Sequence, residues 1–123
     1  MQTFFVTGGA GFIGSAFVRL ILNESPDTEV INYDALTYAG NLDNLDGVDG
    51  ARHRFVHGDI TNRSAVLDAM PMSCEAIINL AAESHVDRSM ASAGEFLRTN
   101  ILATQVLLDV ARERQVRRFV HIS

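Results

Sequence analysis

Short apolar segments alternate with amphipathic segments along the whole chain. The apolar segments are rich in β-branched and aromatic residues and end at glycine or at polar residues. This pattern is typical of strands that are buried on both faces of a parallel sheet. We predict strands over residues 3–7, 29–33, 53–57, 75–80 and 117–122.

Helical periodicity fills three of the intervals between these strands. We predict helices over residues 12–23, 62–70 and 93–114, and a proline follows each of the first two. The polar stretch 35–50 is predicted as a loop with room for one helical turn. The faces expected to be apolar are Ile13, Phe17, Leu20 and Ile21 in the first helix, and Leu97, Ile101, Thr104, Leu108 and Ala111 in the long helix.

Strands that alternate with helices at this spacing predict a particular α/β architecture. The connections favour a parallel sheet with right-handed crossovers and helices on both faces. We therefore predict one Rossmann-type, doubly wound domain over residues 1–123, with five strands in the order 3-2-1-4-5. In this fold, ligands bind where the strand order reverses, outside the carboxyl ends of strands 1 and 4.

Composition narrows the classes of partner. The 123 residues are 47% hydrophobic and 20% charged, as expected for a globular domain, and the net charge is −5. No basic run exceeds Arg117–Arg118, so nucleic acid is not an expected partner. Glycines cut the N-terminal apolar run short, so we expect no signal peptide and no membrane span. The single cysteine, Cys74, suits a reducing cytoplasm, and no Cys/His cluster has the spacing of a metal site.

A glycine-rich segment joins the first predicted strand to the first predicted helix. Gly8, Gly11 and Gly14 have the spacing of a dinucleotide-binding turn, and Gly9 allows a second register of the same motif. Such a turn needs backbone with positive φ, a close approach to a pyrophosphate, and a first helical turn that packs tightly on the strand. The free N–H groups at the helix start would then face the phosphates, although glycine can also serve a merely tight turn.

Acidic residues follow the second and third predicted strands. Asp34 lies twenty positions after Gly14, where a carboxylate would accept hydrogen bonds from the adenosine ribose and repel the 2′-phosphate of NADP. NAD is therefore the expected cofactor, and a solvated turn or a helix cap is the structural alternative for Asp34. Asp59 could hold the adenine amino group while Ile60 covers the ring, but the same residues also suit an ordinary helix entry.

Two further segments carry a family resemblance. The sequences LTYAGN at 36–41 and LAAESHVDRS at 80–89, together with TGGAGFIGS at 7–15, resemble dTDP-glucose 4,6-dehydratases of the extended short-chain dehydrogenase/reductase superfamily. The similarity extends over all 123 residues. It implies that NAD contacts Phe12, Ile13, Asp34, Ala35, Leu36, Thr37, Asp59, Ile60, Leu80, Ala81, Ala82, Glu83, Ser84 and Thr99, and that Ser84 also touches the sugar nucleotide.

The resemblance also implies a reaction and an assembly. Enzymes of this family use bound NAD as a recycled hydride carrier, remove water from dTDP-glucose and form dTDP-4-keto-6-deoxyglucose. Their base is a tyrosine in Tyr-x-x-x-Lys, but this chain has no lysine, so we expect it to contain no catalytic residue. The resemblance implies a homodimer through the helix over 93–114. The alternatives are another sugar-nucleotide enzyme, namely a 4-epimerase or a UDP-glucuronate decarboxylase, or a non-catalytic NAD-binding module.

Overall fold

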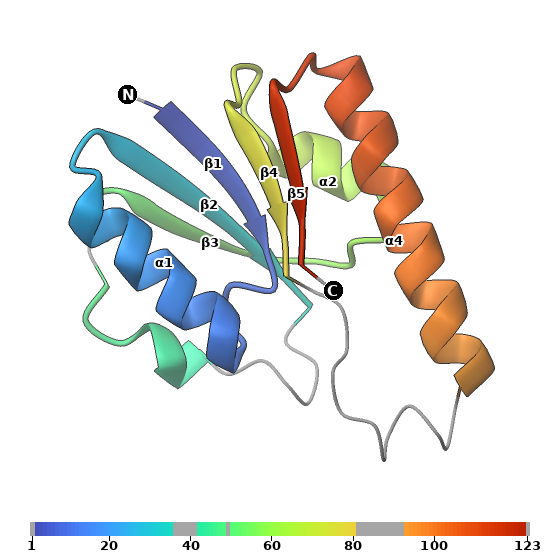
Figure 1. Ribbon diagram of the computed structural model, residues 1–123, viewed down its shortest axis with the longest axis horizontal. Helices are drawn as coiled ribbons and strands as arrows, with labels where there is room; N and C mark the ends of the chain where they lie inside the picture. The colour runs from blue at the N-terminus through green and yellow to red at the C-terminus, as the bar shows by residue number, and fades with distance from the viewer. Residues whose placement is uncertain (1, 36–41, 49, 81–92, 123) are drawn as a thin grey trace.

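The computed structural model describes residues 2–35, 42–48, 50–80 and 93–122, with the backbone alone for Leu42 and residues 93–99. Its strands form one parallel sheet in the order β3-β2-β1-β4-β5, as predicted from the sequence (Figure 1). The strands are β1 (Gln2–Thr7), β2 (Thr28–Asp34), β3 (His53–His57), β4 (Ala76–Asn79) and β5 (Arg118–His121). The helices are α1 (Phe12–Glu24), the 3-10 turn η1 (Leu42–Leu45), α2 (Arg63–Ala69) and α4 (Ala93–Glu113).

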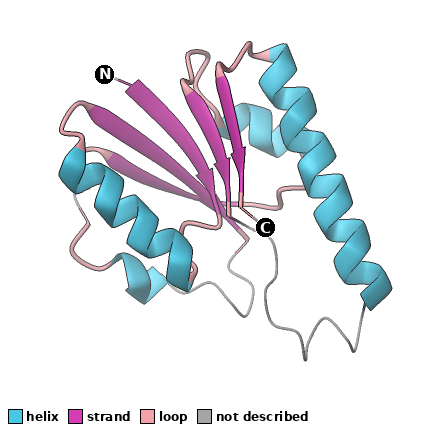
Figure 2. Cartoon of the chain, viewed as in Figure 1, coloured by secondary structure: helices cyan, strands magenta, loops and turns pink. Residues whose placement is uncertain are grey.

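Helices cover both faces of the sheet (Figure 2). On one face, α1 packs its Val18 and Leu22 against alternate strand residues such as Val6 and Val30. On the other face, α2 and α4 pack against the intervening residues, which include Phe5, Ile31, Tyr33 and Ile77. Because successive side chains of a strand point to opposite faces, the same strands supply both cores. The predicted Rossmann-type class is therefore confirmed.

Local hydrogen bonds set the start of α2 and the end of α4. Asn62 precedes α2, and its side-chain oxygen accepts a hydrogen bond from the N–H of Ala65 at 3.1 Å. Beyond α4, Gln115 adopts a positive φ of 54°, and the N–H of Val116 donates to the carbonyl of Ala111 at 2.9 Å. These contacts place the element ends within one or two residues of the predicted bounds.

The apolar face predicted for α1 differs in part from the face that packs on the sheet. Ile13 and Leu20 are 66% and 56% exposed, whereas Val18 and Leu22 are 0% and 4% exposed. Phe17 and Ile21 are half-buried at the margin of the core. The helix is apolar on more than one side, so its periodicity does not decide which side meets the sheet. The side that meets the sheet depends on how the first turn of α1 packs against the loop that joins it to β1.

The long helix shows the same difference between its predicted apolar face and its buried side. Ala103, Leu107 and Val110 form the buried side of α4, while Ile101 and Leu108 are 65% and 49% exposed. Thr104 and Ala111, which were also placed on the apolar face, are half-buried, and the side chain of Leu97 lies outside the described residues. The side chains identified from the sequence share one side of the helix, but it is the neighbouring side that packs on the sheet. No helix among the described residues has the length and apolar character that crossing a membrane requires.

Two leucines of α1 test this assignment. We expect Leu22→Ala to lower the free energy of unfolding by about 2–5 kcal/mol, because the substitution leaves a cavity in the core. Leu20→Ala removes the same atoms from an exposed position, and we expect it to cost less than about 1 kcal/mol. Urea denaturation of both variants measures the difference. Equal losses would contradict the observed orientation of α1.

Candidate functional site

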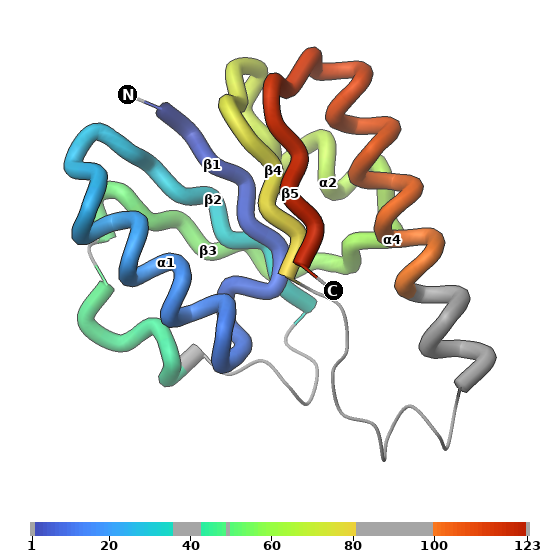
Figure 3. The backbone as a smooth tube through the Cα atoms, in the orientation of Figure 1, coloured from blue at the N-terminus to red at the C-terminus, as the bar shows by residue number. Residues whose placement is uncertain are grey.

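The carboxyl ends of the strands form one continuous edge (Figure 3). The N–H of Gly8 donates to the carbonyl of Tyr33 at 3.2 Å, and that of Gly58 donates to Asp34 at 3.1 Å. Likewise, the N–H of Leu80 donates to the carbonyl of Thr7 at 2.9 Å. The segments that follow β1, β3 and β4 therefore start side by side. Among the described residues, this edge brings together the glycine-rich loop, Asp34 and the starts of the loops at Gly58 and Leu80.

Glycine is required at two positions of the loop between β1 and α1. Gly8 has a φ of +78°, and its carbonyl accepts a hydrogen bond from the N–H of Gly11 at 3.2 Å, which closes a tight turn. A Cβ on Gly14 would lie 2.0 Å from the carbonyl oxygen of Gly8. The first turn of α1 therefore packs directly on the backbone of the loop. These are the geometric requirements on which the dinucleotide motif was predicted.

The start of α1 is suited to an anionic ligand. Gly11 is the N-cap residue, no side chain caps this end, and the first turn contains no acidic residue. The N–H groups of the first turn carry a partial positive charge that favours a phosphate. Phe12 and Ile13 are 86% and 66% exposed at the same end, so their apolar side chains are available to a ligand.

Asp34 is a buried carboxylate at the end of β2. It is 9% exposed, and its Oδ2 accepts a hydrogen bond from the N–H of Ala10 at 3.0 Å. The alternative of a solvated turn carboxylate is therefore wrong. Asp34 holds the middle of the glycine-rich loop, a contact that its position in the sequence did not predict. The contact also brings the carboxylate beside the start of α1, where a ribose joined to a bound pyrophosphate would lie.

The residues after β3 show the structural role that was the alternative to adenine contact. Oδ1 of Asp59 accepts hydrogen bonds from the N–H and Oγ1 of Thr61 at 2.9 and 2.8 Å. Ile60 is half-buried and packs against the core. The hydroxyl of Tyr33 donates to the carbonyl of Asp59 at 2.8 Å. Burial and, to a smaller extent, the Asp59 carboxylate raise the pKa of Tyr33, so this hydroxyl keeps its proton.

The other predicted site residues fall into three groups, according to how far the structure describes them. Ala35 is exposed, with its carbonyl oxygen 3.0 Å from Nε2 of His57, and Leu80 is half-buried. Thr99 lies on α4, where the backbone alone is described. Outside the described residues lie Leu36, Thr37, Ala81, Ala82, Glu83 and Ser84. The predicted contacts of all these residues with a ligand stay predictions.

Sequence reasoning missed several polar residues inside the strands. Oγ1 of Thr7 donates to Oδ1 of Asn79 at 2.6 Å, and Nδ2 of Asn79 lies 3.0 Å from Nδ1 of His121. On the opposite face, Nδ2 of Asn32 lies 3.3 Å from Nε2 of His53, whose pKa burial lowers. A neutral His53 can accept this hydrogen bond. Polar residues within otherwise apolar strands were the available signal, because buried polar groups require partners.

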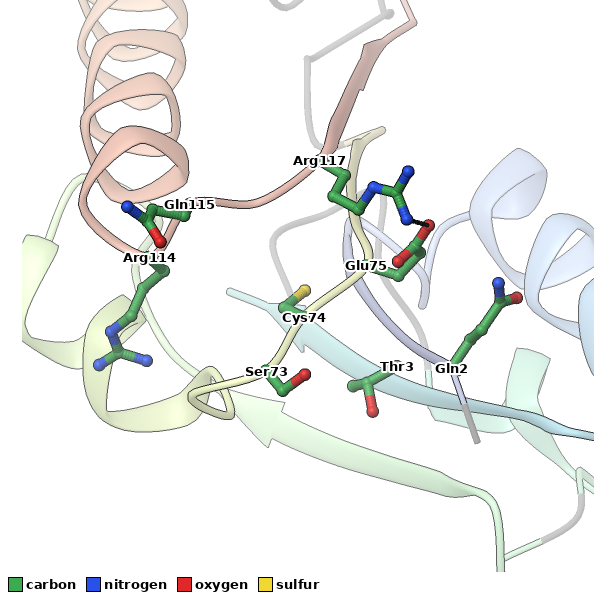
Figure 4. A pocket seen from close by; sticks show the side chains of 8 residues that line it. All are labelled: Gln2, Thr3, Ser73, Cys74, Glu75, Arg114, Gln115 and Arg117. Carbon is green, nitrogen blue, oxygen red and sulfur yellow. Dashed lines mark ion pairs between the residues drawn. The ribbon is translucent and has the colours of Figure 1, made fainter.

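A pocket lies at the opposite end of the sheet from this edge (Figure 4). This cavity of about 260 Å³ is bordered by Cys74, Glu75, Arg114 and Arg117. Arg117 pairs with Glu75 at 4.0 Å, and Arg114 donates to the carbonyl of Leu67 at the end of α2. These charged groups serve packing, and burial raises the pKa of the Cys74 thiol. The carboxyl edge is therefore the better candidate site.

Comparison with known proteins identifies the family. The family model described as the NAD dependent epimerase/dehydratase family matches residues 4–123. The chain belongs to this family. Among curated relatives, it is 54% identical over 119 residues to the low-salt glycan biosynthesis protein Agl12 of Haloferax volcanii. That match covers 96% of this chain and 38% of Agl12. It is 50% identical over 123 residues to a dTDP-glucose 4,6-dehydratase of Streptomyces niveus, covering 96% and 36% respectively.

A solved structure extends the comparison to the fold. The dTDP-glucose 4,6-dehydratase DesIV of Streptomyces venezuelae, solved with NAD bound, superposes with a TM-score of 0.89 at 50% identity. The match covers 98% of this chain and 38% of DesIV. The resemblance to dTDP-glucose 4,6-dehydratases is confirmed. The chain spans somewhat more than a third of the length of the curated relatives it matches, at 38% and 36%.

Proposed function

We propose that residues 1–123 form the NAD-binding part of a dTDP-glucose 4,6-dehydratase, which converts dTDP-glucose into dTDP-4-keto-6-deoxyglucose and water. The observation that carries this proposal is the carboxyl edge, where Gly8, Gly14 and Asp34 build one cradle. The identity of about half of all residues to a named dehydratase, over nearly the whole chain, supports the choice of reaction.

The residues of this edge fit NAD. The N–H groups at the start of α1 would receive the pyrophosphate, with Phe12 and Ile13 beside it, and Asp34 would receive the ribose hydroxyls. Asp59, Ile60 and Leu80 begin the loops on either side. We extend the proposal to Ala35, Leu36, Thr37, Ala81, Ala82, Glu83 and Thr99 as cofactor contacts, and to Ser84 as a contact to both NAD and the sugar nucleotide. When bound, NAD supplies a hydride acceptor that also returns the hydride.

The protein residues have two tasks in this reaction. The described edge orients the cofactor, because hydrogen bonds to Asp34 and Asn44 fix the loop on both sides. Proton transfer needs a base, and the 123 residues contain no Tyr-x-x-x-Lys. We propose that residues beyond this part of the dehydratase supply it. We also propose a cytoplasmic location, where reducing conditions suit the buried free thiol of Cys74.

The mass of the product tests the proposed reaction. We expect the full-length protein, incubated with dTDP-glucose, to yield a sugar nucleotide that is lighter by one water. A 4-epimerase would yield a product of unchanged mass, and a decarboxylase would release carbon dioxide from UDP-glucuronate. Mass spectrometry of parallel reactions with dTDP-glucose, UDP-glucose and UDP-glucuronate separates the three activities. NAD binding without turnover of any of them would support the non-catalytic module instead.

Asp34 offers a test of cofactor choice. Asp34→Asn keeps an oxygen for the N–H of Ala10 but removes the negative charge, so we expect a weaker preference for NAD over NADP. Asp34→Ala also leaves that buried N–H without its acceptor, and we expect NAD affinity to fall by at least about tenfold. Calorimetric titration with both cofactors measures these changes. Asp68→Asn makes the same substitution at an exposed position of α2 and serves as the control. Unchanged selectivity in Asp34→Asn would contradict the proposed ribose contact.

We infer that the dehydratase is a homodimer that packs through α4. Ile101, Leu102 and Leu108 are 65%, 42% and 49% exposed on this helix, although another stripe of it already covers the sheet. Exposed apolar side chains gathered on one helix favour an interface.

Light scattering tests this interface. We expect Leu108→Asp to convert the dimer of the full-length protein into a monomer, because the substitution would bury a charge. Leu20→Asp makes the same change at an exposed leucine of α1 and should leave the dimer intact. A Leu108→Asp variant that stays dimeric would contradict the proposed interface.

A further inference from the structure

Ala10 is held from two directions at the centre of the glycine-rich loop. Its N–H donates to Oδ2 of Asp34 at 3.0 Å, and its carbonyl oxygen accepts a hydrogen bond from Nδ2 of Asn44 at 2.9 Å. Ala10 itself is fully buried. Asp34 lies at the end of β2, which is expected to face the cofactor, whereas Asn44 belongs to the turn η1.

The bond to Asn44 controls more than one atom. A peptide unit is planar, so the carbonyl of Ala10 and the N–H of Gly11 share one rigid plane. Gly11 is the N-cap of α1, and the N–H groups of the first helical turn follow directly. The N–H of Gly11 donates to the carbonyl of Gly8 at 3.2 Å, so this peptide is held at both of its polar ends. The bond from Asn44 therefore helps to fix the peptide from which the first turn of α1 starts.

Asn44 is itself anchored to α1. Nη2 of Arg19 donates to the carbonyl of Asn44 at 2.6 Å and to that of Asp46 at 2.6 Å. Leu45 and Val48, on either side of Asp46, pack against the core beneath α1. The chain thus forms a closed circuit that leads from Ala10 along α1 to Arg19 and returns through Asn44. The side chain of Asn44 is half-buried and held toward the loop by its hydrogen bond to Ala10.

We propose that Asn44 is a positioning residue for the cofactor, with Arg19 as its support. Asn44 acts on the pyrophosphate subsite through the peptide of Ala10 and needs no contact with the ligand. The proposal rests on the NAD-binding function proposed above. It makes the turn η1 part of the binding machinery, although η1 follows a different strand from the glycine-rich loop.

The hydrogen bond between Asn44 and Ala10 can be tested with two variants of Asn44. Only the amide –NH₂ of Asn44 can face a carbonyl, because two acceptors repel each other. Asn44→Asp preserves the shape but replaces this donor with a carboxylate oxygen, whereas Asn44→Ala removes the group and leaves the carbonyl to water. Asn23→Asp makes the same chemical change at an exposed position of α1 and serves as the matched control.

The experiment measures NAD affinity and turnover in the full-length protein. We expect the dissociation constant for NAD to rise about tenfold in Asn44→Asp and about threefold in Asn44→Ala, and to stay within about twofold in Asn23→Asp. Because the residue positions the cofactor site and does no chemistry, saturating NAD should restore the wild-type kcat in both Asn44 variants. The melting temperature without NAD should stay close to that of the wild type.

Other outcomes would contradict either the positioning role of Asn44 or the proposed function. Unchanged NAD affinity in both Asn44 variants would overturn the positioning role. A reduced kcat at saturating NAD together with a lowered melting temperature would also overturn it, since the residue would then be merely structural. If Asn44→Asp fails to fold, Asn44→Ala decides between these outcomes. Failure of the wild-type protein to bind NAD would instead overturn the proposed function.

Discussion

The close packing between the first turn of α1 and the glycine-rich loop determines much of the structure around it. A Cβ on Gly14 would lie 2.0 Å from the carbonyl oxygen of Gly8, so only glycine allows the helix to start this near to β1. Once Gly14 faces the loop, helical geometry turns Val18 and Leu22 toward the sheet, at intervals of four residues. The same contact therefore sets the core face of α1 and points its N-terminus along the carboxyl edge.

Polar groups are concentrated at this edge and must be satisfied inside the protein. Thr7 and Asn79 bond to each other at the ends of β1 and β4, while the N–H of Ala10 bonds to Asp34 at the end of β2. Hydrogen bonds between buried groups offset the cost of removing them from water. Farther from the edge, the same strands carry residues such as Phe5 and Ile31, which supply the apolar core. The apolar core and the candidate cofactor site thus occupy different segments of the same strands.

The sequence predicted the elements of this fold better than it predicted their rotation. Strands of a doubly wound sheet are short apolar runs, so their positions and order could be predicted from pattern and connection rules. The packed face of α4 could not, because Leu107 and Leu108 are both apolar and only the three-dimensional fit buries the first. In the candidate site, Gly8 and Gly14 could be identified because their roles depend on local backbone geometry. The contact between Asn44 and Ala10 joins residues 34 positions apart, and no spacing rule indicates it.

The double use of Asp34 links cofactor choice to the geometry of the loop. A site that accepts a 2′-phosphate would have to lose the carboxylate, since the two negative charges would repel each other. Substitution of Asp34 by a residue without a side-chain acceptor, such as alanine, would also leave the buried N–H of Ala10 unsatisfied, at a cost of about 1–3 kcal/mol. That N–H lies one residue before the N-cap of the helix that would hold the pyrophosphate. A change of cofactor therefore requires a neutral residue at position 34 that still accepts this hydrogen bond, as asparagine would, or a second substitution that supplies an acceptor. Asn44 cannot supply it, because its side-chain N–H already donates to the carbonyl of Ala10.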